Sequence, residues 1–187
     1  TQEEKESINK YFPNAAISIV KNPLAIQNIS SKHINKRFVY FGRFNKHKNL
    51  KEFITAFILA NPGNEWSFHI YGIEDDEVYK NDLLKLVSNS GFKKSIKFIK
   101  PEFDIKKKFK IISESWCNVL LSKSEILSLS VLEAFSVGTQ SFVNKKIFFP
   151  KWIQKYLIRS EVNDTDLVKN IRLIMNQDIE KKKYLKK

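Results

Sequence analysis

Cysteine, histidine and long apolar runs are scarce in this chain, and each shortage excludes a class of protein. The 187 residues include one Cys and three His. One Cys cannot form an internal disulfide, which excludes a disulfide-stapled scaffold. So few ligands cannot build a His/Cys-rich metal cluster, although a carboxylate site stays possible. No apolar run approaches the about 18 residues that span a bilayer, and the first residues lack a signal-peptide pattern.

Acidic residues are also in the minority. The chain carries 33 Lys and Arg against 20 Asp and Glu, a formal net charge of +13, while 42% of its residues are hydrophobic. That hydrophobic content argues against disorder and is enough for a sizeable core. The excess charge suggests an anionic partner, which is nucleic acid, a membrane surface or a phosphorylated ligand. A lysine-rich solvated surface is the alternative reading of the same charge.

Strand-like and helix-like patterns alternate along most of the chain. Short apolar runs predict strands near residues 37–41, 66–71, 95–99, 117–121 and 140–143. Apolar residues at helical spacing predict helices near residues 50–58, 79–87, 105–112, 129–135 and 167–175. This alternation predicts an α/β fold, a Rossmann-like, mostly parallel sheet with helices on both faces.

Three local features refine this prediction. Ala16–Val20 is a candidate short strand near the N-terminus. Asn49 followed by Glu52 resembles a capping box that opens a helix. Asp164 is a plausible cap for the last helix.

A basic loop follows the first strand of the predicted sheet, over residues 42–50. Ligands of open parallel sheets bind beyond the carboxyl ends of the strands, where this loop lies. It leaves the strand at Gly42 and presents Arg43 and Lys48 beside a helix N-terminus. Helix N-termini favour anions, and nearby cations add charge-assisted hydrogen bonds. The loop is therefore a candidate phosphate site.

An acidic segment follows the fourth strand, over residues 122–135. It contains Glu125 in the loop and Glu133 on the following helix, with Ser128 near the helix N-terminus. A carboxylate facing this edge of the sheet is suited to accept hydrogen bonds from the vicinal hydroxyls of a ribose or a sugar. Two ordinary surface carboxylates are the alternative.

Taken in this order, the two segments resemble the C-terminal, donor-binding half of glycosyltransferase family 4, which has the GT-B architecture of two Rossmann-like domains. The resemblance covers roughly residues 17–175, and Asn22-Pro23 resembles the junction that leaves the N-terminal domain. The residues that carry it are Gly42, Arg43, Lys48, Glu125, Glu133, Ala134 and Gly138.

The resemblance implies a role for each of these side chains. Arg43 and Lys48 would grip the diphosphate of a nucleotide-sugar donor, Glu133 would hold the ribose, and Glu125 would contact the transferred sugar. Backbone N–H groups of Ser128, Leu129 and Ser130 would assist. The reaction implied is retaining transfer of the sugar to an acceptor hydroxyl, in surface glycan or glycolipid synthesis. No metal or other cofactor is implied, because the protein cations replace magnesium.

The resemblance also implies a division of the chain. Residues 1–30 would be the end of an N-terminal region and an interdomain linker, residues 31–176 the donor-binding domain, and residues 177–187 a basic tail. Acceptor groups would come from an N-terminal domain that the chain lacks. We therefore expect the isolated chain to bind a nucleotide sugar without turnover.

Departures from the family pattern leave other functions open. The family's glycines are replaced by Ile126, Ser128 and Asn49, and a common proline by Gln140. Ile126 would crowd the donor sugar, since glycine allows close backbone approach. A non-catalytic glycosyltransferase-like partner subunit is therefore one alternative.

The remaining positive charge supports a further alternative. Lysines are dense over residues 93–110 and at the C-terminus, which suits either a basic nucleic-acid-binding module or an anionic membrane surface. The two carboxylates in the candidate cleft would repel a nucleic-acid backbone. We expect a cytoplasmic chain, peripheral on the inner face of the plasma membrane if it binds lipid.

Overall fold

The computed structural model describes residues 2–19, 29, 31, 33–125 and 128–178. Within these ranges six strands form one sheet in the order β3-β2-β1-β4-β5-β6, and every neighbouring pair is parallel. The strands are β1 (Asn35–Phe44), β2 (Ser67–Glu74), β3 (Ile96–Ile99), β4 (Ser115–Leu120), β5 (Gln140–Asn144) and β6 (Leu157–Ser160). The predicted α/β fold with a Rossmann-like parallel sheet is confirmed.

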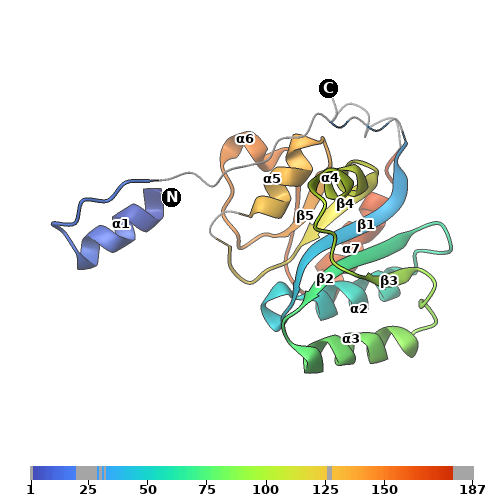
Figure 1. Ribbon diagram of the computed structural model, residues 1–187. Coiled ribbons are helices and arrows are strands. Elements are labelled where there is room, and N and C mark those ends of the chain that lie inside the picture. The colour runs from blue at the N-terminus through green and yellow to red at the C-terminus, as the bar shows by residue number, and fades with distance from the viewer. Residues whose placement is uncertain (1, 20–28, 30, 32, 126–127, 179–187) are drawn as a thin grey trace.

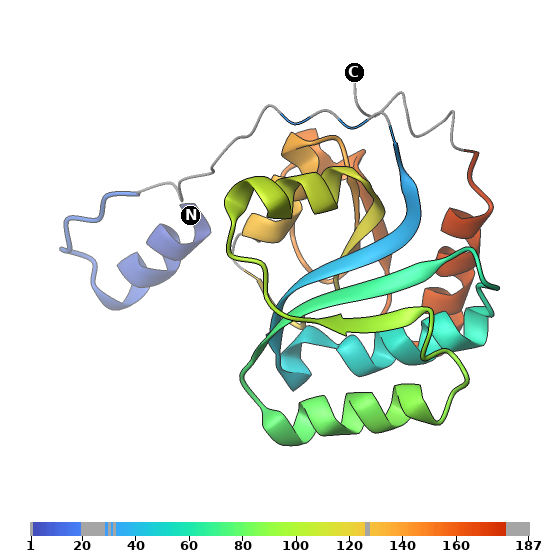
Figure 2. The same ribbon diagram turned by 45° about the vertical axis from the view of Figure 1, so that its right-hand side comes forward.

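Helices cover both faces of this sheet. Figures 1 and 2 show α2, α3 and α7 on one face and α4, α5 and α6 on the other, with α1 set apart from the sheet. The bounds are α1 (Gln2–Tyr11), α2 (Leu50–Ala60), α3 (Glu77–Ser88), α4 (Ile105–Ser113), α5 (Leu129–Ser136), α6 (Lys151–Gln154) and α7 (Asp164–Met175), with a 3₁₀ turn η1 (Lys46–Lys48). No helix of the described ranges is both long and apolar enough to cross a membrane.

An aromatic core joins β1 to α2. Phe38 of β1 lies 5.5 Å from Phe53 and 5.9 Å from Phe57 between ring centroids, and all three side chains are fully buried. The helical spacing of Phe53 and Phe57 places both rings on one face of α2. Trp66 and Trp116 pack edge to face at 5.4 Å in the same cluster. This core fixes where β1 ends and α2 begins, and the candidate phosphate loop lies between them.

Several local predictions were wrong. Residues 16–19 form no strand, and Val20 lies outside the described residues. The cap of α7 is Asn163, whose side chain accepts a hydrogen bond from the backbone of Asp166, because Asp164 is already helical. The chain also forms α6 and β6, which sequence patterns did not predict. The Asn22-Pro23 junction and the terminal lysines 181–187 lie outside the described residues.

Candidate functional site

The basic loop is held by its two asparagines. Asn45 accepts a hydrogen bond from the backbone of His47 at 2.9 Å. Asn49 has a positive φ of 50° and donates from Nδ2 to the carbonyl of Leu121 at 2.7 Å. Asparagine is among the few residues that adopt this left-handed conformation readily, so Asn49 can stand where the family pattern has glycine.

The expected capping box does not form. Asn49 makes no side-chain cap for α2, because its amide is turned toward the end of β4. The backbone N–H of Lys51 donates instead to the hydroxyl of Tyr79 at 3.1 Å. The Oε2 atom of Glu52 is buried and makes no hydrogen bond within the described residues. The start of α2 is thus set by tertiary contacts.

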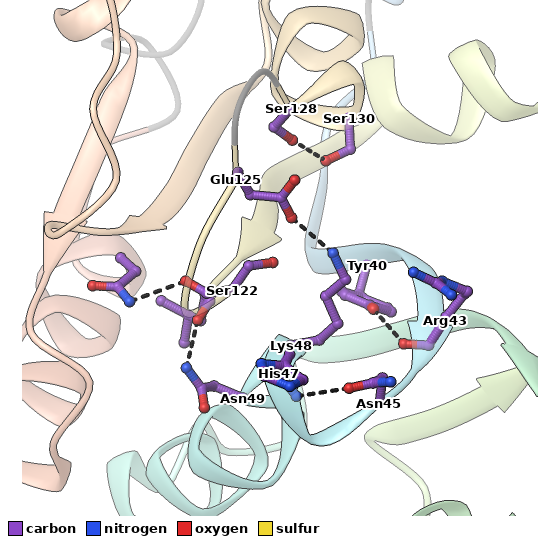
Figure 3. A network of polar contacts seen from close by, with 12 residues as sticks. Tyr40, Arg43, Asn45, His47, Lys48, Asn49, Ser122, Glu125, Ser128 and Ser130 are labelled. Carbon is purple, nitrogen blue, oxygen red and sulfur yellow. Dashed lines mark hydrogen bonds and ion pairs between the residues drawn. The ribbon is translucent and has the colours of Figure 1, made fainter. Parts of the chain in front are cut away.

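Backbone contacts tie the loop after β1 to the loop after β4. The N–H of Lys123 donates to the carbonyl of His47 at 2.8 Å. From the other side, Asn144 at the end of β5 donates to the carbonyl of Ser122 at 3.0 Å. The carboxyl ends of three strands are therefore cross-linked into one rigid edge, which Figure 3 shows from close by.

A cavity of about 260 Å³ opens at this edge between β1, β4 and α5. Tyr40 and Phe41 form part of its wall. Six of the eight predicted site residues also line it, namely Gly42, Lys48, Glu125, Ser128, Leu129 and Ser130. The structure thus brings together two loops separated by about 75 residues of sequence, as the position of strand ends predicts.

Lys48 and Glu125 form an ion pair inside this cavity. The Nζ atom of Lys48 lies 2.7 Å from Oε1 of Glu125, and the two side chains are 23% and 18% exposed. Figure 3 shows them reaching toward each other from opposite loops. Each charge needs a partner because its contact with water is limited. An anion at Lys48 and hydroxyl groups at Glu125 would each offer a replacement.

Gly42 allows the chain to pass close to Tyr40. A Cβ atom at this position would lie 2.5 Å from the hydroxyl of Tyr40. That hydroxyl donates to the carbonyl of Arg43 at 2.7 Å (Figure 3). Burial raises the pKa of Tyr40 well above its ordinary value, so the phenol stays protonated and keeps this bond. Gly42 and Tyr40 together fix the direction in which the loop leaves β1.

The N-terminus of α5 faces the same cavity. Ser128 is the N-cap residue but makes no side-chain cap, and its hydroxyl lies 3.1 Å from that of Ser130. The Ser128 side chain therefore leaves the first N–H groups of the helix to other acceptors. Ile126, which precedes this turn, lies outside the described residues.

Arg43 is placed differently from Lys48. Its side chain is 61% exposed, and its Nη1 lies 3.5 Å from Oδ2 of Asp75. Asn45 donates to the same carboxylate oxygen at 2.9 Å. Arg43 does not line the cavity. In this structure it pairs at the rim with a carboxylate from the end of β2.

Glu133 also lies beside the cavity and not on its wall. Its carboxylate is bound by Lys108 of α4, at 2.7 Å from Nζ to Oε1. Sequence reasoning missed Lys108, which is 25 residues away along the chain. The available signal was weak, because Lys108 precedes the apolar Phe109 in a lysine-rich helix and resembles its exposed neighbours.

A larger cavity of about 610 Å³ lies on the other side of the cross-linked loops. It is lined by polar side chains that include Asn49, Glu52, Lys123 and Asn144. None of the predicted site residues contributes to it.

Comparison with known proteins gives one family. A family model described as glycosyl transferases group 1 matches residues 24–187. No curated protein matches the chain.

Solved structures of low sequence identity share its fold. TarM from S. aureus, solved with fondaparinux, α-GlcNAc-glycerol and UDP, is 20% identical over 99% of this chain and 39% of its own, with a TM-score of 0.74. The pneumococcal O-GlcNAc transferase GtfA, solved with UDP and GlcNAc, is 18% identical over 99% and 39%, with a TM-score of 0.73. A GtfA/B complex is 16% identical over 99% and 40%, with a TM-score of 0.69. The chain thus spans about two fifths of the length of these neighbours and has the fold of a Rossmann-like domain of GT-B glycosyltransferases.

Proposed function

The chain belongs to the group 1 glycosyl transferases, and on that premise we propose that it is the donor-binding half of a retaining, family 4-like glycosyltransferase. Its substrate would be a nucleotide-diphosphate sugar, with UDP as the first candidate because two neighbouring structures contain UDP. The domain itself would extend over residues 31–176, between an N-terminal linker and a basic tail.

The observation that carries this proposal is the composition of the smaller cavity. It combines a cation, Lys48, a carboxylate, Glu125, and the N-terminus of α5 around a backbone that passes closely at Gly42. A nucleotide-diphosphate sugar presents the complementary groups, since the diphosphate needs cations and N–H donors and the sugar needs hydrogen-bond acceptors. Such a ligand would take both partners of the Lys48–Glu125 pair at once.

The same groups account for catalysis. Negative charge grows on the leaving diphosphate as the bond to the sugar breaks. Cations and N–H groups already aimed at that phosphate stabilise the transition state more than the ground state. Lys48 and the first N–H groups of α5 are placed for this role. Arg43 would join them after turning from Asp75, and an exposed pair of this kind is held by no more than about 1 kcal/mol.

The two carboxylates would orient the sugar-bearing ends of the donor. Glu125, released by Lys48, would accept hydrogen bonds from the transferred sugar, and Glu133 from the ribose. No metal is required in this scheme, because Lys48 and Arg43 supply the positive charge. The acceptor and its base would come from a second domain.

A non-catalytic partner subunit is the second candidate. Two observations favour it: the family's proline is Gln140 here, and one neighbour of the same fold was solved as a two-component complex. Complementation by an amino-terminal half, with and without Glu133→Ala, separates the two candidates. An enzyme loses activity with the substitution, whereas a non-catalytic subunit does not.

Titration calorimetry tests the proposed function. The chain is titrated with UDP, GDP and their sugars, and a nucleic-acid duplex of random sequence serves as the rival ligand. We expect saturable binding of a nucleoside diphosphate and of its sugar, without release of free sugar by the isolated chain. Binding of the duplex alone, or of no nucleotide, would refute the proposal.

A further inference from the structure

Lys108 is the feature of the site that neither the sequence patterns nor the family resemblance assigns. It lies on α4, and its Nζ is 2.7 Å from both carboxylate oxygens of Glu133 on α5. The two side chains are 24% and 15% exposed. Among the ion pairs of the described residues, only Lys48–Glu125 is similarly enclosed, whereas Lys36–Glu65 and Lys80–Glu74 are far more open.

The backbone beneath this pair is rigid. Phe109 and Ala134, which follow Lys108 and Glu133 in the sequence, are buried together in the small apolar cluster between α4 and α5. Phe41 packs against the same cluster. The two charged side chains therefore start from helices whose separation is fixed by apolar packing.

Lys108 also contacts the wall of the smaller cavity. Its ammonium lies 5.5 Å from the centre of the Phe41 ring, within the range of a cation–π contact. Phe41 lines the cavity and stacks on Tyr71, with ring centroids 4.7 Å apart. Lys108 thus links the cavity wall to the carboxylate that stands one helical turn beyond Ser130.

We propose that Lys108 is a positioning residue that holds Glu133 for recognition of the donor ribose. This inference rests on the proposed function, because it takes the nucleotide as the ligand of the cavity. A carboxylate that is mostly shielded from water must be paired to stay charged and in place. Lys108 supplies the pairing charge, and the Phe41 ring and the α4–α5 packing limit how far the pair can move.

Recognition of ribose depends on this arrangement. Vicinal ribose hydroxyls donate hydrogen bonds, and a carboxylate that is already oriented loses little conformational freedom on accepting them. Without Lys108, Glu133 would turn toward solvent, and the ribose hydroxyls would lose their acceptor. The loss should therefore appear only with ligands that carry those hydroxyls.

The matched variants are Lys108→Met, Lys108→Arg and Lys107→Met. Methionine keeps most of the length and apolar stem of lysine without its charge, and Lys107 is an exposed neighbour on the same helix. Each variant is titrated with UDP and with 2′,3′-dideoxyuridine diphosphate by calorimetry, after thermal melts confirm the fold. GDP and its dideoxy analogue replace them if GDP is the nucleotide that wild type binds.

We expect Lys108→Met to bind UDP about tenfold more weakly, the size of a lost hydrogen bond to a charged group. Its affinity for the dideoxy nucleotide should equal that of wild type, Lys107→Met should change neither ligand, and Lys108→Arg should restore part of the loss. Equal weakening for both ligands would show a phosphate contact or a general structural effect and overturn the inference, as would behaviour identical to Lys107→Met. If wild type binds no nucleotide, the proposed function itself fails.

Discussion

Two cations of one loop, Lys48 and Arg43, lie in contrasting surroundings. Lys48 is 23% exposed and 2.7 Å from its carboxylate partner inside the cavity. Arg43 is 61% exposed and 3.5 Å from Asp75 at the rim. Charges near each other in the sequence thus differ in how strongly they can act on a ligand. The interior charge works in a lower effective dielectric, whereas water and salt screen the charge at the rim.

The largest effect should come from removing the interior cation. We expect Lys48→Met to weaken UDP binding about 100-fold, because a charge-assisted contact to phosphate is lost in a shielded cavity. Lys46→Met is the control, since Lys46 belongs to the same loop and is exposed. Calorimetry measures both variants. Equal losses in the two would mean that the loop acts only through its overall charge.

The next effect concerns the wall that separates interior from rim. Gly42→Ala would place a Cβ 2.5 Å from the Tyr40 hydroxyl, and the forced shift should cost about 1–3 kcal/mol of unfolding free energy. Urea unfolding measures this cost. In a Tyr40→Ala background the same substitution should cost much less. An unchanged cost there would place the strain elsewhere.

A smaller effect is expected at the rim. Arg43→Ala should weaken UDP binding about threefold at moderate salt, in line with the small energies of exposed ion pairs. Asp75→Asn should strengthen binding slightly by releasing Arg43. If Arg43→Ala instead equals Lys48→Met, Arg43 turns fully into the cavity when the donor binds, and the contrast between the two cations disappears.

The smallest effect lies away from both cations, at His69 of β2. Burial is the main cause that lowers the pKa of His69 to about 4, and its buried Nδ1 makes no hydrogen bond within the described residues. The unfolded chain therefore binds a proton more readily between pH 6.5 and 4, so stability falls as the pH drops through this window. His69→Gln should lose less stability than wild type between pH 7 and 5 in urea unfolding. Parallel curves would exclude this contribution.

The positions of the strands and loops could be predicted because their signals are local. Strand-like runs alternate with helical spacing, and parallel topology then places the loops after β1 and β4 at one edge. Short elements carried too little signal, which is why β6 (Leu157–Ser160) and α6 (Lys151–Gln154) were missed.

The pairing of side chains could not be predicted in the same way. Lys48 meets Glu125 across 77 residues, and Lys108 meets Glu133 across 25. Asn49 looked like a helix cap, yet a carbonyl at the end of β4 takes its amide. Such choices depend on which partners the completed sheet brings within reach, and a single sequence holds no local mark of them.

A crystal structure of the chain with UDP tests the central claim most directly. The account predicts the diphosphate in the smaller cavity, within hydrogen-bond distance of Lys48 and the N-terminus of α5, with the Lys48–Glu125 pair broken and the ribose beside Glu133. UDP bound in the larger cavity near Glu52, or UDP bound with that ion pair intact, would contradict it.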